Sequence, residues 1–208
     1  MRIKIDYKLK IFCLCIRRDC KRICQQVTNS KSYWGKIERN RSFGAMEKNK
    51  AVFLDRDGVL NKELGDYVCK LEDFHVLEHN FAPLKALQDR GYLLIVITNQ
   101  GGTAKGWYSE ETLGQMHDHL RATYEAHGIH LTEIYYCRHH PDYNGRCLCR
   151  KPGSLMLEKG VARFNVDASR SYFIGDRERD VIAGEAAGLT GILIDSDQPI
   201  SEVLHLIN

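Results

Sequence analysis

Two features are scarce in this 208-residue chain: long apolar runs and, near its start, acidic residues. No apolar run approaches the roughly 20 residues that a bilayer-spanning helix needs, so we expect no membrane partner. Residues 1–45 hold three Asp or Glu against twelve Lys or Arg, whereas the remainder holds 24 against 18. The basic pI therefore belongs to the first 45 residues, and the rest gives no reason to expect a nucleic-acid partner.

In residues 1–45 the apolar residues also do not recur at the spacing of a helix or a strand. Their apolar stretch Ile11–Ile16 is too short for a signal-peptide core, and no small-residue cleavage site follows it. The four cysteines of this stretch contain no C-x-x-C pair, which makes a metal site there the weaker interpretation. We expect residues 1–45 to be a disordered basic extension, or a segment outside the native chain, and residues 46–208 to form the folded domain.

After Met46 the sequence alternates between short apolar strands and capped helices. Strands are predicted at 51–54, 92–98, 133–136, 171–174 and 191–194. Helices are predicted at 80–88 with Asn80 as the cap, from Ser109 as the cap to Gly128, from Ser154 onward, and at 180–187 and 201–207. This alternation predicts an α/β fold with a doubly wound, mostly parallel, Rossmann-like sheet and no separate cap domain. Ligands of such sheets bind beyond the carboxyl ends of the strands.

Polar residues follow the first two predicted strands. Asp55 and Asp57 stand two residues apart after a buried strand, where a divalent cation would offset their repulsion. Thr98, Asn99, Gln100 and Gly101 follow the second strand, and their hydroxyl, amides and backbone N–H groups could cradle a phosphoryl oxygen. Each motif alone is also compatible with an ordinary acidic turn or a glycine-rich loop.

Two later motifs have the same character. Arg150 and Lys151 precede a predicted helix and could neutralise anionic groups, although such pairs are usually solvated. Asp176 follows the fourth strand, and Asp180 suits a helix cap. Because the fold would gather all four motifs at one edge of the sheet, together they predict a phosphate site.

The order D-x-D-G-V, T-N-Q, R-K-P and G-D-x-x-x-D resembles the haloacid-dehalogenase-type phosphatases over about the whole of 51–194. The resemblance implies that Asp55 is a nucleophile that forms an aspartyl-phosphate and that Asp57 is the general acid and base. It implies Mg²⁺ held by Asp55, the Asp57 backbone carbonyl and Asp176, with Thr98 and Lys151 on the phosphoryl oxygens. The non-enzyme alternative is a phosphate-binding module with the same fold. The presence of both Asp55 and Asp57 disfavours it.

A second metal site is indicated by the pattern C-x-H-x₇-C-x-C in the loop 137–149. Cys137, His139, Cys147 and Cys149 would complete a closed, structural Zn²⁺ site directly before Arg150. His140 offers the same imidazole, so the spacing leaves two candidates for the fourth ligand. Thiolate ligation suits a reducing compartment, and we expect a cytoplasmic protein.

This zinc loop resembles the branch that contains heptose 1,7-bisphosphate 7-phosphatases and histidinol-phosphatases. The strings Y-Y-C-x-H-H-P and C-x-C-R-K-P are closer to the heptose enzymes. The resemblance implies substrate contacts from Glu63, Tyr67, Asn99, Gln100, Gly101, Arg150 and Arg177. An extra residue between Asn61 and Tyr67 leaves the match of Glu63 open, and Arg177 stands where the heptose enzyme has Lys.

The implied reaction is hydrolysis of the C7 phosphate of D-glycero-D-manno-heptose 1,7-bisphosphate to heptose 1-phosphate. We expect the protein to be a monomer. Arg at the position of Arg177 also occurs in the histidinol branch. Histidinol phosphate, or another small sugar phosphate, is therefore the alternative substrate.

Overall fold

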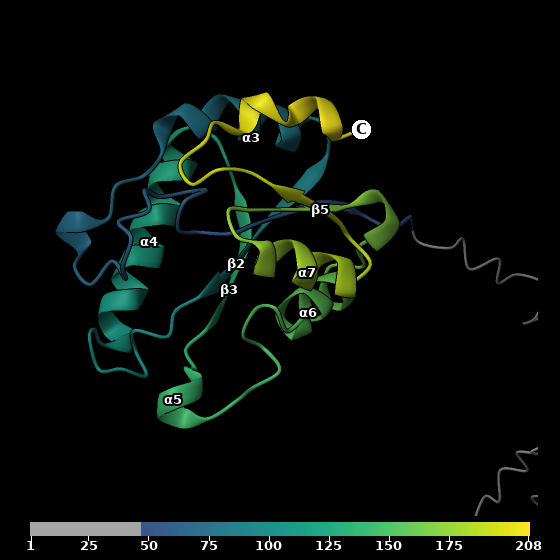
Figure 1. The fold of residues 1–208 in the computed structure, drawn as a ribbon. Helices are drawn as coiled ribbons and strands as arrows, with labels where there is room; N and C mark the ends of the chain where they lie inside the picture. The colour runs from purple at the N-terminus through teal and green to yellow at the C-terminus, as the bar shows by residue number, and fades with distance from the viewer. Residues whose placement is uncertain (1–46) are drawn as a thin grey trace, which may run out of the picture. The chain divides into compact units, whose positions relative to one another are not determined.

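The computed structural model describes residues 47–208, and the expectations for residues 1–45 lie outside this range. Its centre is a five-stranded sheet in the order β3-β2-β1-β4-β5, in which every pair of neighbours is parallel (Figure 1). The strands are β1 (Lys50–Leu54), β2 (Tyr92–Asn99), β3 (Leu131–Cys137), β4 (Tyr172–Gly175) and β5 (Thr190–Leu193). The predicted doubly wound parallel sheet is confirmed.

The helices are α3 (Phe81–Asp89), α4 (Glu110–Ala126), α5 (Pro141–Asn144), α6 (Leu155–Arg163) and α7 (Glu178–Ala186). Ser109 caps α4 as predicted, because its hydroxyl accepts a hydrogen bond from the Thr112 N–H at 3.0 Å. The expected cap at Asn80 is wrong: its side chain instead bonds the Val59 carbonyl and the Ile200 N–H. Within residues 47–208, no helix is both long and apolar enough to cross a bilayer.

Short 3₁₀ turns complete the described part of the chain. They lie at Leu71–Asp73, Glu78–Asn80, Ala168–Arg170, Ile200–Glu202 and Leu204–Leu206. The last two replace the single helix predicted at 201–207. Asn80 joins this C-terminal segment to the loop after β1, so tertiary contact and not helix propensity shapes it.

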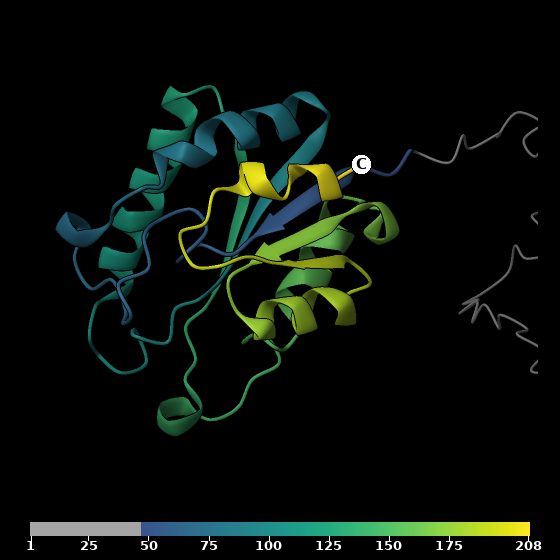
Figure 2. The ribbon, with the colours of Figure 1, turned by 45° about the horizontal axis from the view of Figure 1, so that its top comes forward.

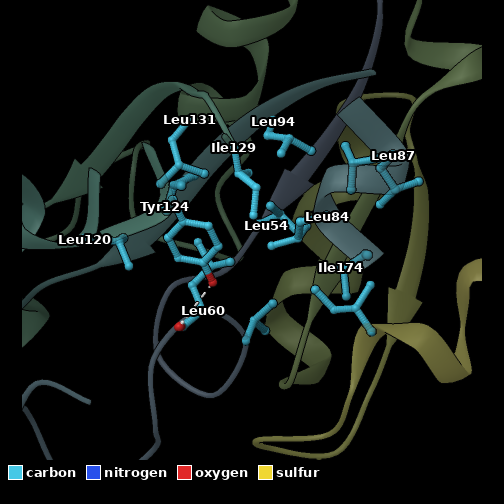
Figure 3. Packing of buried hydrophobic residues seen from close by; sticks show 14 of the residues in the cluster. Leu54, Leu60, Leu84, Leu87, Leu94, Leu120, Tyr124, Ile129, Leu131 and Ile174 are labelled. Carbon is cyan, nitrogen blue, oxygen red and sulfur yellow. Dashed lines mark hydrogen bonds between the residues drawn. The ribbon is translucent and has the colours of Figure 1, made fainter. Parts of the chain in front are cut away.

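Two apolar layers sandwich the sheet, because alternate residues of each strand point to opposite faces. Val52 and Leu54 of β1 belong to the cluster shared with α3, α4 and the C-terminal turns, part of which Figure 3 shows. Ala51 and Phe53 belong to the cluster on the other face, under α6 and α7. Figure 2 shows these helices on the two sides of the strands. Burial on both faces explains why β1 and β2 read as continuous apolar runs.

The strand order places the first strand in the middle of the sheet. From β1 the chain runs outward through β2 and β3, and then returns to add β4 and β5 on the other side. The loops that follow β1 and β4 therefore diverge at the topological switch point, where open α/β sheets bind ligands. Helix α5 belongs to the loop between β3 and α6 and stands apart from the helical layers (Figure 1).

Candidate active site

A polar pocket of about 330 Å³ is built from the loops after β1, β2 and β4 and from the segment before α6. It is lined by Asp55, Asp57, Glu63, Gly65, Asp66, Tyr67, Thr98, Asn99, Arg150, Arg177 and Arg179. The four strand-end motifs thus meet in one place, at the switch point of the sheet.

A buried ion cluster forms the floor of the site. Lys151 Nζ lies 2.8 Å from Asp55 Oδ1 and 2.8 Å from Asp180 Oδ1, and it donates to the Ile97 carbonyl at 2.9 Å. The ammonium thus lies between two carboxylates and one carbonyl, in a position closed to solvent. Burial raises the pKa of Asp55 to about 7, with Lys151 opposing this rise and Asp180 adding to it.

Asp57 is surrounded by hydrogen-bond donors. Arg56 Nη2 lies 2.7 Å from Asp57 Oδ1, Asn61 Nδ2 donates to the same oxygen at 3.0 Å, and Gln100 Nε2 donates to Oδ2 at 2.8 Å. Burial would raise the pKa of Asp57, but the Arg56 charge and these hydrogen bonds outweigh it and leave the pKa below its usual value. The side chain keeps a quarter of its surface exposed toward solvent.

Hard oxygen donors for a cation lie beside these two acids. One carboxylate oxygen from each of Asp55, Asp176 and Asp180 lies within 4.8 Å of the others. Asp180 faces Lys151 with Oδ1 and accepts from the Arg177 N–H with Oδ2, so both of its oxygens are engaged. By contrast, Asp55 and Asp176 each use one oxygen in contacts among residues 47–208. Gly58 permits this approach, since a Cβ there would lie 2.5 Å from the Asp176 carboxylate. The donor set fits Mg²⁺.

The loop after β2 supports its neighbours more than it faces the pocket. Asn99 bonds the backbone of Lys151 through both ends of its amide, at 3.0 and 3.1 Å. The Gln100 side chain is fully buried and bonds Asp57, Thr98 and the Tyr108 hydroxyl. The expectation that Gln100 contacts substrate therefore does not extend to its side chain, whose polar atoms are all engaged.

Three arginines line the outer part of the pocket. Arg177 lies 3.6 Å from Glu63 and 3.3 Å from Asp176, so it bridges the rim and the acid centre. Arg150 Nη1 donates to the His139 carbonyl at 3.1 Å. Gly101 lets this arginine and Tyr67 come close, since a Cβ there would lie 3.1 Å from Arg150 Nη1 and 3.0 Å from Tyr67 Oη.

The cysteine loop closes into a compact cluster. Cys137, His139, Cys147 and Cys149 each offer a ligand atom within 4.8 Å of the others. Cys149 Sγ lies 3.3 Å from His139 Nδ1, whereas His140 Nδ1 accepts from the Asp142 N–H at 3.3 Å. His139 is therefore the imidazole of this cluster. Burial raises the pKa of the Cys137 thiol, so a bound cation is what would favour its thiolate.

Sequence patterns missed several residues of this site. Arg179 and Asp66 line the pocket, and Asp180 pairs with Lys151 besides bonding the first turn of α7. Arg56 was visible only as the variable position inside D-x-D, yet it is fully buried against Asp57. The one available signal was an arginine two residues after a buried strand, between two acids, because a charge is rarely buried without a partner.

Comparisons with known proteins agree with this geometry. The HAD-hydrolase-like family model matches residues 148–204. A solved D,D-heptose 1,7-bisphosphate phosphatase from B. bronchiseptica, complexed with magnesium and phosphate, superposes with a TM-score of 0.66 at 28% identity, covering 74% of this chain and 86% of that chain. The chain is thus similar in fold and sequence to an enzyme of known structure.

Curated relatives are closer in sequence. A D-glycero-beta-D-manno-heptose-1,7-bisphosphate 7-phosphatase from Haemophilus ducreyi is 41% identical, over 73% of this chain and 86% of the relative. A D-glycero-alpha-D-manno-heptose-1,7-bisphosphate 7-phosphatase from Photorhabdus laumondii is 38% identical, over 74% of this chain and 87% of the relative. Identity of this level over most of both chains shows that the chain belongs to the heptose-1,7-bisphosphate 7-phosphatase family of HAD-like hydrolases.

Proposed function

We propose that this chain hydrolyses the C7 phosphate of D-glycero-D-manno-heptose 1,7-bisphosphate and releases heptose 1-phosphate. The observation that carries the proposal is the Asp55–Lys151 pair at 2.8 Å, beside Asp57 and beneath a rim of arginines. A nucleophilic carboxylate, an acid and separate cations for a second anion are what a bisphosphate phosphatase requires.

In the first half-reaction the Asp55 carboxylate attacks phosphorus. Its Oδ1 accepts from Lys151 and from the Arg56 N–H at 2.7 Å, so Oδ2 is the oxygen left to form the bond. The bond from phosphorus to O7 of the sugar breaks, and Asp57 gives its proton to that oxygen. The products are an aspartyl-phosphate and the sugar 1-phosphate.

In the second half-reaction Asp57 takes a proton from water, and the resulting hydroxide attacks the phosphorus of the aspartyl-phosphate. Phosphate leaves, Asp55 is restored, and the proton taken from water replaces the one that Asp57 gave to the sugar oxygen. The lowered pKa of Asp57 keeps its carboxylate ionised in the absence of a neighbouring anion, and a group must be ionised to accept a proton. For the first half, the dianionic phosphate of the substrate supplies the like charge that raises the pKa of a neighbouring carboxyl.

Two metals accompany this proposal. Asp55, Asp176 and the backbone carbonyl of Asp57 would hold Mg²⁺, which supplies positive charge that lowers the repulsion between the carboxylate and the phosphate. Cys137, His139, Cys147 and Cys149 would hold a structural Zn²⁺. Because Arg150 bonds the His139 carbonyl, order in the zinc loop bears directly on the pocket.

Substrate choice rests on the rim. Arg150, Arg177 and Arg179 are available to a second phosphate, which favours a bisphosphate over a monophosphate. Glu63 and Asp66 also line the pocket and could bind a cationic substrate. These two carboxylates are the observation that keeps histidinol phosphate as a second candidate. We also propose that the enzyme acts as a monomer in the cytoplasm.

A substrate panel tests the proposal. We expect Mg²⁺-dependent phosphate release with the highest kcat/KM for heptose 1,7-bisphosphate, compared with heptose 7-phosphate and histidinol phosphate. Equal or better activity on histidinol phosphate would move the chain to the neighbouring branch of the family. Absence of phosphate release from all three would leave the phosphate-binding module as the better description.

A further inference from the structure

A second layer of side chains stands behind Asp57. Arg56 is fully buried and faces Asp57 with Nε at 3.1 Å and Nη2 at 2.7 Å. Its remaining nitrogen, Nη1, lies 3.3 Å from Nε2 of His117, which comes from α4, 61 residues further along the chain. The ring of Phe74 lies 5.3 Å from the guanidinium. The two edges of Arg56 are thus used by one carboxylate and one imidazole.

The imidazole must act as an acceptor in this contact. A guanidinium carries only donors, so the Nε2 lone pair of His117 faces Arg56 and the proton of the neutral ring lies on Nδ1. His117 is 7% exposed, and its ring lies 5.3 Å from that of Tyr136. Burial first, and then the Arg56 charge, lowers the pKa of His117 to about 3. The His117 ring is therefore neutral at every pH at which the enzyme would be assayed.

We infer that His117 is a positioning residue, which holds the Arg56 guanidinium so that Asp57 presents its proton to the leaving oxygen. Gln100 and Asn61 hold Asp57 from other sides, but only Arg56 bonds both of its carboxylate oxygens. Without His117, the buried Nη1 donor of Arg56 would have no acceptor. The cost of this unpaired donor would favour a shift of the Arg56 side chain away from Asp57. This inference rests on the proposed role of Asp57 as general acid and base.

The nature of the leaving group separates positioning from simple packing. A sugar alkoxide needs a proton as it departs, whereas 4-nitrophenolate is a stable anion and departs without one. In the first half-reaction, followed in the pre-steady state, we expect His117→Leu to slow phosphoryl transfer from heptose 1,7-bisphosphate to Asp55 by about tenfold or more. With 4-nitrophenyl phosphate, the first half-reaction, followed as the burst of 4-nitrophenolate, should stay within about twofold of wild type, because the hydrolysis of the aspartyl-phosphate, which also uses Asp57, comes after it.

Two variants complete the experiment. His117→Gln offers an amide oxygen at a similar reach and should bring the first half-reaction with the sugar substrate to within about threefold of wild type. Met116→Ala, at the adjacent buried position of α4, should lower the melting temperature and leave the ratio of the two substrates unchanged. Should His117→Leu not fold, His117→Asn replaces it, because its shorter amide does not reach Arg56.

Different results would contradict the positioning role of His117 and the proposed phosphatase function. Suppose the wild type is active on both substrates. If the first half-reaction of His117→Leu then slows by the same factor with each substrate, or with neither, the positioning role alone is overturned. Failure of His117→Gln to restore the sugar reaction also overturns it. A wild type that releases phosphate from neither substrate overturns the proposed function itself.

Discussion

Replacing Lys151 by Met removes the cation that two buried carboxylates share. Asp55 and Asp180 are 4% and 0% exposed, and each lies 2.8 Å from the Lys151 ammonium. Breaking a buried ion pair by removing one partner costs about 3–5 kcal/mol. Since both ion pairs depend on the Lys151 side chain, we expect the free energy of unfolding to fall by about this amount once, and not by twice this amount.

The destabilisation should depend on pH. Asp55 already has its pKa raised by burial from 3.8 to about 7, and removing Lys151 takes away the main influence that lowers it. A carboxyl whose folded pKa exceeds its unfolded value costs stability above the folded pKa, and the cost vanishes below the unfolded pKa. The gap between variant and wild type should therefore be largest at pH 8 and should shrink to about 1 kcal/mol or less near pH 4.

The assay is urea unfolding followed by circular dichroism at pH 4, 6 and 8, with and without Mg²⁺. Mg²⁺ should narrow the gap at pH 8, because it supplies positive charge beside Asp55. Lys159→Met, at an exposed lysine of α6, is the matched control and should stay within about 0.5 kcal/mol of wild type. A gap that is equal at pH 4 and pH 8 would refute the argument from the uncompensated carboxylates.

Three further outcomes are expected. Asp55→Asn should abolish phosphate release and keep the wild-type circular dichroism spectrum, and measurable turnover by the pure variant would rule out the nucleophile. Metal analysis should find about one zinc per chain, with less in Cys149→Ser, and a zinc-free active protein would contradict the structural site. Arg150→Ala should reduce the preference for bisphosphate over monophosphate by roughly ten- to a hundredfold in kcat/KM, whereas an equal loss on both would place Arg150 on the reacting phosphate.

Much of the fold was readable from local patterns. Apolar runs at β1 and β2 predicted buried parallel strands, and Ser109 predicted the start of α4 because a cap depends on residues three positions apart. The failures lie where distant contacts compete with local preference. Asn80 was predicted to cap α3, but the Val59 carbonyl and the Ile200 N–H took its amide.

The sequence by itself determined that the four strand-end motifs gather at the pocket, because strand ends in a parallel sheet meet at one edge whatever the loops between them do. It could not determine how those residues pair. Lys151 reaches Asp180, Arg56 reaches His117, and Cys149 lies by His139 instead of His140 only through the packing of the helices and loops on the sheet. Such pairings depend on distances of a few ångströms between segments that are far apart in the chain. Residue spacing carries no information at that scale, and the tertiary structure alone decides them.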